Sequence, residues 1–179
     1  TVFTQQKAYS ISQSSYLAGL AGTAINTNIP NTWTLAVTSG LNVFTIDGSK
    51  LGSPRNIDFT GLQSNSTIVI NVTGNVNSFG TQITSGYEQV VWNVVNATTI
   101  NIDQRDLNGS VLAPNATVYQ NKVINGTLVA NGWVSSGNVE VHSHIFKGDL
   151  GEPSVPGPAA ALSFGSALVV GLIRRRKKA

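Results

Sequence analysis

Asn108-Gly-Ser-Val-Leu-Ala-Pro-Asn115 and Asn125-Gly-Thr-Leu-Val-Ala-Asn-Gly132 are two copies of one short pattern, offset by 17 residues from Asn108 to Asn125. Each copy opens with Asn-Gly, a pair that favours a tight turn, and continues into an apolar stretch. A unit this short cannot bury its own apolar face, so each copy must pack on a neighbour. The repeat therefore predicts stacked coils of short strands, a β-solenoid. Two copies leave an antiparallel sandwich open as the alternative.

The chain from residue 31 to about 148 has the composition of short strands. Its β-branched runs are separated by Gly, Asn, Asp and Ser, and no segment long enough for a helix interrupts them. A βαβ enzyme fold is therefore disfavoured. The clearest runs are Trp33-Thr-Leu-Ala-Val-Thr38, Asn42-Val-Phe-Thr-Ile46, Thr67-Ile-Val-Ile-Asn-Val72, Gln89-Val-Val-Trp-Asn-Val-Val95 and Thr98-Thr-Ile-Asn-Ile102.

Residues 1 to about 24 are predicted to form an α-helix packed against the β domain. Gly19 and Gly22 weaken the end of this helix. Lys7 is its only cation, so a helix lying on a membrane surface is disfavoured. The apolar stripe expected to face the domain consists of Ala8, Ile11, Ser15 and Ala18 at helical spacing, widened by Leu17, Leu20 and Ala21.

The formal charge of +3 combines two unlike parts of the chain. Eleven Lys and Arg stand against eight Asp and Glu, and five of the cations are residues 174–178. The rest of the chain is therefore weakly acidic, which excludes a basic nucleic-acid-binding body. The chain contains no Cys, which excludes disulfides, thiolate metal sites and a Cys nucleophile.

The C-terminal part differs from the rest in composition. We expect a Pro-rich linker at 151–158, then a hydrophobic helix with a basic end at 159–179, whose apolar run 159–173 enters the inner membrane. These features resemble a PEP-CTERM sorting signal, although Gly157 replaces the usual Glu. The resemblance implies processing by an exosortase-like sorting enzyme. The residues that carry it are Val155, Pro156, Gly157, Pro158, Arg174, Arg175 and Arg176.

Residues 1–150 resemble the choice-of-anchor A family of bacterial surface domains. The most specific part of the match is the segment from Leu107 to Ala130, supported by Asn42-Val-Phe-Thr-Ile-Asp47, Val91-Trp-Asn-Val-Val-Asn-Ala-Thr98 and Gly137-Asn-Val-Glu-Val-His142. Further β segments usually precede the helix in this family, so we expect the chain to be the C-terminal part of a longer domain. The resemblance implies an extracellular, adhesive or matrix-associated role without enzymatic activity.

Few side chains suggest a specific chemistry. Glu140, His142 and His144 alternate along an expected strand, where they could bind Zn²⁺ from one face. Trp133 follows a Gly turn and is a candidate for an exposed ligand contact, whereas Trp92 lies within an apolar run and is expected in the core. Asp103 and Asp106 flank Arg105, but acids in one turn more often bond turn backbone than act as a catalytic pair.

The sequence thus predicts a non-catalytic protein, exported to the cell surface or the extracellular matrix and adhesive in function. Extracellular polysaccharide or a matrix protein is the expected ligand, and no cofactor or nucleic acid is expected. The alternatives are a polysaccharide-active β-helix enzyme and an ice-binding-like module. An acid pair converging in a groove would favour the enzyme, and a flat row of Thr would favour ice.

Overall fold

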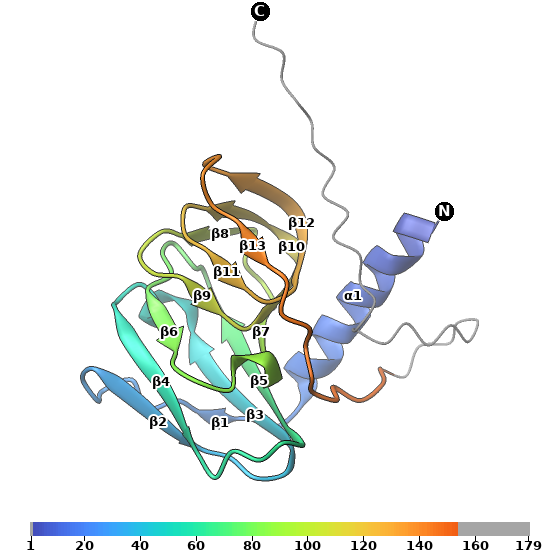
Figure 1. Cartoon of the computed structure of the whole chain (residues 1–179). Helices are drawn as coiled ribbons and strands as arrows, with labels where there is room; N and C mark the ends of the chain where they lie inside the picture. The colour runs from blue at the N-terminus through green and yellow to red at the C-terminus, as the bar shows by residue number, and fades with distance from the viewer. Residues whose placement is uncertain (1, 154–179) are drawn as a thin grey trace, which may run out of the picture.

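The computed structural model describes residues 2–153, which form a β-solenoid of about four turns with one helix along its side (Figure 1). Each strand pairing in this part of the chain is parallel. The predicted mainly β solenoid with an N-terminal helix is confirmed, and the antiparallel sandwich is excluded.

Three sheets make up the walls of the solenoid. The seven-stranded sheet has the order β1–β3–β5–β7–β10–β12, with β8 also beside β10. Its strands are β1 (Thr23–Ala24), β3 (Gly40–Asp47), β5 (Ser66–Thr73), β7 (Val90–Val94), β8 (Thr99–Ile102), β10 (Ser110–Gln120) and β12 (Leu128–Ser135).

Two three-stranded sheets carry the returning strands and face the viewer in Figure 1. They are built from β2 (Thr32–Ala36), β4 (Arg55–Thr60) and β6 (Thr81–Ile83), and from β9 (Leu107–Asn108), β11 (Ile124–Asn125) and β13 (Val141–His142). Two short 3-10 turns, η1 (Gly48–Lys50) and η2 (Tyr87–Gln89), lie between strands.

In the seven-stranded sheet the coils shorten from β3 onward. Gly40 of β3 pairs with Ser66 of β5, 26 positions later, whereas Val111 of β10 pairs with Leu128 of β12, only 17 positions later. The 17-residue sequence repeat is thus one full coil, and Asn108 and Asn125 pair directly. The Asn-Gly turns need glycine, because a Cβ on Gly126 would lie 2.3 Å from the carbonyl oxygen of Gly109.

The interior of the solenoid is apolar and closely filled. Inward side chains from successive coils stack on one another, and Trp33, Ile57, Ile83 and Trp92 are almost completely buried. The predicted core position of Trp92 is confirmed, and its indole N–H donates to the carbonyl oxygen of Asn108 at 2.9 Å. This bond satisfies the one polar atom that the ring brings into the core.

Helix α1 (Val2–Gly19) lies against β5, β7 and β10 of the seven-stranded sheet. It ends earlier than predicted. Its predicted contact face is correct only in part: Leu17 is buried as predicted, but Ala8, Ser15 and Ala18 are exposed, and Gln13 and Ser14 are buried instead. The helix is rotated because it docks through hydrogen bonds as well as through Leu17.

Two buried asparagines, Asn71 and Asn93, form this docking contact, which we call the covered ladder. Asn93 Nδ2 donates to Asn71 Oδ1 at 2.8 Å and to the carbonyl oxygen of Ser14 at 2.9 Å, while Ser14 Oγ donates to Asn93 Oδ1 at 2.7 Å. Asn71 Nδ2 donates to the carbonyl oxygen of Leu17 at 2.8 Å. Carbonyl groups near the C-terminal end of the helix thus find partners in the sheet.

After β13 the chain returns along the helix as an extended segment, the C-terminal strap (residues 143–152). Phe146 and Leu150 are buried with Leu17 in a second apolar cluster on the outer side of the seven-stranded sheet. The backbone N–H of Lys147 donates to the carbonyl oxygen of Glu88 at 2.8 Å. Within residues 2–153 no helix is long and apolar enough to cross a membrane. The predicted helix at 159–179 and most of the linker at 151–158 lie outside the described residues.

Candidate functional site

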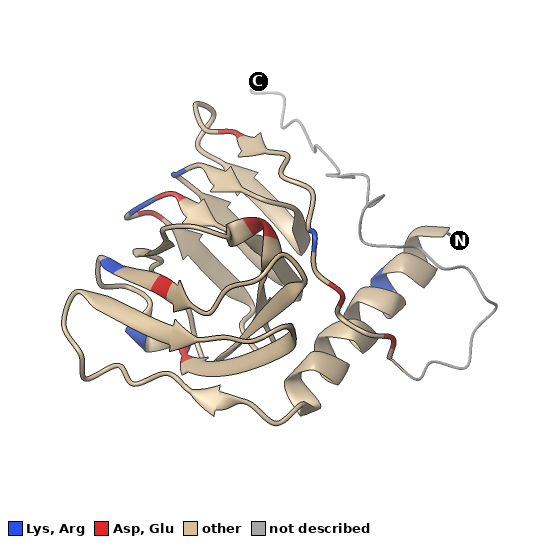
Figure 2. Cartoon of the chain, turned by 60° about the horizontal axis from the view of Figure 1, so that its bottom comes forward, with Lys and Arg blue, Asp and Glu red and all other residues tan. Residues whose placement is uncertain are grey.

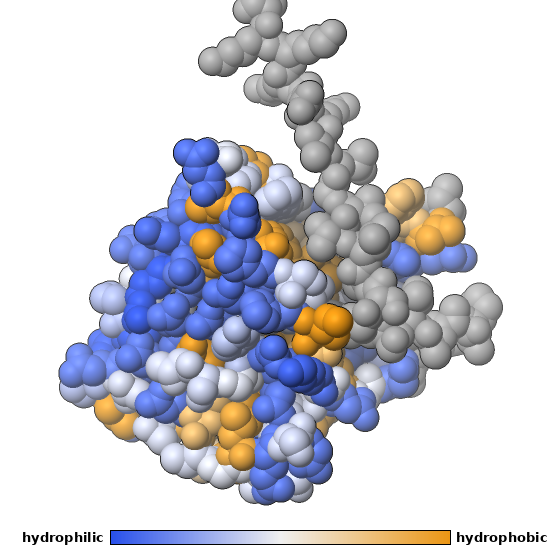
Figure 3. Space-filling view, viewed as in Figure 1, coloured by the Kyte–Doolittle hydropathy of each residue, from blue (hydrophilic) through white to orange (hydrophobic). Residues whose placement is uncertain are grey.

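The outward sides of β2, β4, β6, β9, β11 and β13 form one broad surface rich in hydrogen-bonding groups, which we call the polar face (Figure 3). Parallel pairing places its side chains in rows that cross the strands. Thr32 pairs with Asn56, and Asn56 pairs with Gln82. In the next row Thr34 pairs with Asp58, whose carboxylate accepts a hydrogen bond from Thr84.

The second half of the polar face carries an exposed ladder, made of Asn108, Asn125 and His142. Asn125 Nδ2 donates to Asn108 Oδ1 at 2.8 Å, and Asn108 Nδ2 donates to the carbonyl oxygen of Ile83 at 2.7 Å. The bond to Ile83 joins the two small sheets into one surface. Since Asn125 uses its NH₂ group toward Asn108, its oxygen faces His142 Nδ1 at 3.0 Å.

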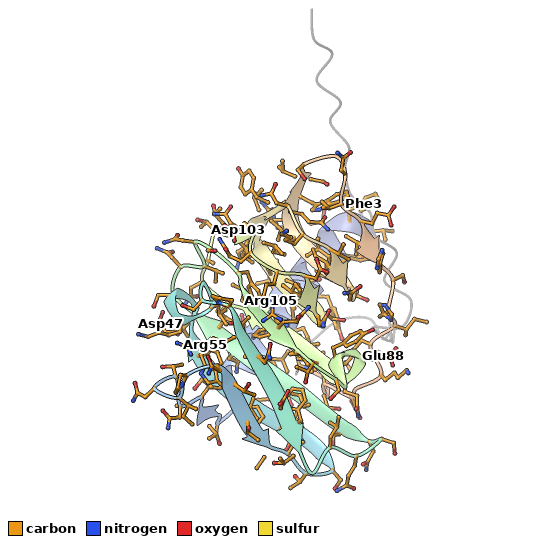
Figure 4. The ribbon with its side chains drawn as sticks, turned by 60° about the vertical axis from the view of Figure 1, so that its left-hand side comes forward. Phe3, Asp47, Arg55, Glu88, Asp103 and Arg105 are labelled. Carbon is orange, nitrogen blue, oxygen red and sulfur yellow. The ribbon has the colours of Figure 1, made fainter. Side chains whose placement is uncertain are left out.

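Arg105 lies across the polar face between the two small sheets. Its Nη1 donates to Asn56 Oδ1 at 2.9 Å and to the carbonyl oxygen of Arg55 at 3.2 Å, and its Nη2 donates to Gln82 Oε1 at 2.6 Å. All three acceptors are neutral. Figure 4 shows Arg105 in the region of Arg55 and Asp103, away from Glu88.

The acids next to Arg105 in sequence do not form a catalytic pair. Asp103 Oδ1 accepts from Ser78 Oγ at 2.6 Å and from the backbone N–H of Phe79 at 3.2 Å. Asp106 Oδ1 accepts from the backbone N–H of Val123 at 3.0 Å. Both side chains bond the turns of neighbouring coils, which is the structural role that the sequence favoured.

Trp133 is exposed over 39% of its surface, as expected for a contact residue. Its register partner is the buried Val118, so the ring lies on the inward side of β12, at the end of the solenoid and away from the polar face. The indole N–H donates to Oε1 of the buried Gln120 at 2.8 Å, which holds the ring in place. Its role in ligand contact stays a prediction.

The three residues of the metal hypothesis have different partners. His142 Nε2 lies 3.2 Å from Glu140 Oε2, whereas His144 lies beyond β13, with its Nδ1 3.6 Å from Glu88 Oε1 and its ring edge-on to Tyr87. Within residues 2–153 no three His, Asp or Glu side chains gather as a metal site would require. The geometry therefore gives the zinc hypothesis no support.

Glu88 is instead part of the attachment of the C-terminal strap. Its carboxylate pairs with the Lys147 ammonium and with His144. The hydrogen bond from Lys147 is the main cause that holds the pKa of Glu88 below its usual value, and His144 adds to the effect. The residues predicted to form the sorting signal, Val155, Pro156, Gly157, Pro158, Arg174, Arg175 and Arg176, all lie outside the described residues.

The fold and the site together define a class of protein: a short parallel β-solenoid with a helix packed on one side and rows of polar side chains on another. A family model described as "Putative Ice-binding-like adhesive domain" matches residues 1–143, so the chain belongs to this family. No curated protein and no solved structure matches the chain. The match supports an adhesive domain and fits a non-catalytic role, while the choice-of-anchor A and PEP-CTERM resemblances stay predictions.

Sequence reasoning missed Arg105 as a surface group and the covered ladder. The 17-residue spacing of Asn108 and Asn125 contained the signal for the exposed ladder, because equal positions in successive coils share a face. The covered ladder had no such signal, since Asn71 and Asn93 are 22 positions apart in coils of changing length.

Proposed function

We propose that the protein is an exported adhesive domain of the cell surface or matrix, which binds extracellular polysaccharide through its polar face. The observation that carries this proposal is the pair of in-register rows, Thr32–Asn56–Gln82 and Asn108–Asn125–His142, on one continuous surface. A polysaccharide presents hydroxyl groups at a regular repeat, and rows of amides and hydroxyls fixed by parallel strands offer partners at a regular repeat too.

The internal bonds of the polar face favour this role. Asn108 and Asn125 are held by each other, and Asn56 and Gln82 are held by Arg105, so their conformational entropy is already reduced before a ligand arrives. Each amide keeps further donor or acceptor capacity for the ligand. Many such weak contacts along one polymer add up to firm attachment.

The C-terminal segment completes the proposal. Residues 155–158 and 174–176 act as a signal for an exosortase-like enzyme, and residues 159–173 hold the protein in the inner membrane until sorting is complete. The five terminal cations favour the cytoplasmic side. The domain would then lie outside the cytoplasm, where polysaccharide is available.

The test is to measure binding of the full chain to purified exopolysaccharides by calorimetry. Asn125→Ala removes the middle of the exposed ladder, and we expect it to weaken binding by about tenfold. Asn115→Ala is the matched control, because Asn115 is an exposed asparagine of β10 outside the polar face. A wild-type chain that binds no polysaccharide, or two variants that bind equally well, would contradict the proposal.

Ice binding is a second candidate, favoured by the description of the family. The rows of the polar face are in register, but they mix Thr with Asn, Gln and Asp, whereas an ice-ordering surface would use repeated threonines. Thermal hysteresis of the full chain decides between the two. A clear difference between the melting and freezing temperatures that Thr34→Ala and Thr84→Ala abolish would favour ice binding. No such difference would favour adhesion.

A further inference from the structure

The guanidinium of Arg105 has no anionic partner among residues 2–153. Within residues 2–153 the ion pairs are His142–Glu140, His144–Glu88 and Lys147–Glu88, and neither arginine of this part of the chain takes part. The neighbouring acids form no ion pair with Arg105, and Asp103 and Asp106 bond instead to Ser78, Phe79 and Val123. A half-buried guanidinium, held by neutral acceptors and without a salt bridge in this part of the chain, therefore lies on the polar face.

The hydrogen bonds of Arg105 leave capacity for a ligand. A guanidinium has five N–H donors, and three bonds are used toward Arg55, Asn56 and Gln82. Two N–H groups of Arg105 therefore stay available. A bidentate pair with one carboxylate needs two N–H donors. Because two side chains and one backbone carbonyl fix the planar group, little side-chain entropy is lost when a carboxylate binds.

We infer that Arg105 binds the carboxylate of a uronic acid residue, so that the ligand of the polar face is an acidic polysaccharide. This inference rests on the proposed function and names the ligand class of the same surface. Asn56 and Gln82 position the guanidinium, and their row continues to Thr32; sugar hydroxyls bind along this row and along the exposed ladder. Charge recognition at one position and hydroxyl recognition along the rows together select a polymer of uronate sugars.

The experiment measures binding of the full chain to polygalacturonate, to the same polymer after reduction of its carboxyl groups, and to neutral dextran. The five C-terminal cations attract any polyanion, so the comparison is made between variants that all keep them. Arg105→Lys retains the charge and loses the planar fork, whereas Lys122→Gln loses an exposed charge and retains the fork. We expect polygalacturonate affinity to fall by about tenfold or more for Arg105→Lys and to change little for Lys122→Gln.

A second pair of variants leaves Arg105 in place. Gln82→Glu puts a carboxylate where Oε1 now lies 2.6 Å from Nη2, which satisfies the guanidinium internally. Gln104→Glu adds the same charge at an exposed neighbour. We expect Gln82→Glu to lose polygalacturonate binding with an unchanged or raised Tm, while Gln104→Glu keeps most of it.

Equal losses for Lys122→Gln and Arg105→Lys, full binding by Gln82→Glu, or equal affinity for the carboxyl-reduced polymer would each overturn the inference. Dextran and the reduced polymer separate the two levels of the proposal. If they bind as tightly as polygalacturonate, the assignment of Arg105 fails while polysaccharide adhesion stands. If none of the three polymers and no exopolysaccharide binds, polysaccharide adhesion itself fails.

Discussion

The covered ladder and the exposed ladder use the same bond in two different settings. Asn93 Nδ2 donates to Asn71 Oδ1 at 2.8 Å beneath the helix, and Asn125 Nδ2 donates to Asn108 Oδ1 at 2.8 Å on the polar face. Both bonds join paired residues of adjacent parallel strands. Asn71 and Asn93 are exposed by 2% or less, whereas Asn108 and Asn125 are only half-buried.

A stacked asparagine therefore has no fixed role in a solenoid. Under α1 each remaining polar group of the ladder has a protein partner, so the bonds fix the helix and water is excluded. On the polar face water or a ligand can complete the remaining bonds. Burial makes the first ladder a structural element, and exposure leaves the second available for binding. Lys, Arg, Asp and Glu are sparse along the described ribbon (Figure 2).

The largest effect is expected for Asn93→Ala, which breaks the covered ladder at its centre. The change removes three hydrogen bonds and leaves Asn71 Oδ1, Ser14 Oγ and the Ser14 carbonyl without this partner. We expect a loss of about 3 kcal/mol in the free energy of unfolding, measured by urea denaturation. Asn115→Ala should cost less than about 0.5 kcal/mol, and equal costs for the two would contradict a structural role for the ladder.

Ser14→Ala tests the helix side of the same contact. It removes only the hydroxyl that donates to Asn93 Oδ1, while the backbone carbonyl of Ser14 keeps its bond. We expect a cost of about 1.5 kcal/mol. The neighbouring Ser15→Ala, at an exposed position of α1, should be neutral or slightly stabilising because alanine is the better helix former. A larger loss in the free energy of unfolding for Ser15→Ala than for Ser14→Ala would contradict the docking role of the Ser14 hydroxyl.

Acid should loosen the C-terminal strap before the rest of the domain. The pKa of Glu88 is lowered in the folded protein by Lys147 and His144, so its contribution is present above the ordinary value of 4.5 and is lost as the pH falls through the lowered pKa. Hydrogen exchange of the Lys147 and Asp149 amides should therefore accelerate in this acidic range, once corrected for intrinsic rates. Glu88→Gln should abolish this pH dependence, and an unchanged profile would refute the assignment.

Among the ladder variants, the smallest effect on stability is expected for Asn125→Ala. Water can replace the lost bonds to Asn108 and His142, so the free energy of unfolding should change by less than about 1 kcal/mol. The costs of Asn125→Ala and Asn93→Ala can be compared directly, since both variants remove the donor of an equivalent Asn–Asn hydrogen bond. A cost for Asn125→Ala as large as that for Asn93→Ala would mean that the exposed ladder is structural as well.

The solenoid could be predicted from the sequence because the coils at its C-terminal end have a constant length, which makes a repeat visible there. The earlier coils differ in length and show no such repeat. Asn108 and Asn125 are one coil apart, and Trp92 was assigned to the core from its apolar neighbours. The docking face of α1 could not be predicted from hydrophobic periodicity, because Ser14 is buried through hydrogen bonds to a sheet residue 79 positions away.

The candidate site was predictable only in part. Alternation along the chain brought Glu140 and His142 together, but it could not show that β13 ends at His142 and that His144 turns to Glu88. Likewise, the position of Arg105 depends on side chains of two earlier coils, Asn56 and Gln82, which no local pattern connects to it.

The most direct test of the account is an NMR titration of the full chain with polygalacturonate, observed at the side-chain NH₂ groups of asparagine and glutamine. We predict that the signals of Asn56, Gln82, Asn108 and Asn125 shift, while those of Asn71 and Asn93 stay unchanged as internal controls. Shifts confined to the indole N–H of Trp133, or no shift in the four polar-face amides at saturation, would contradict the assignment of the polar face as the adhesive surface.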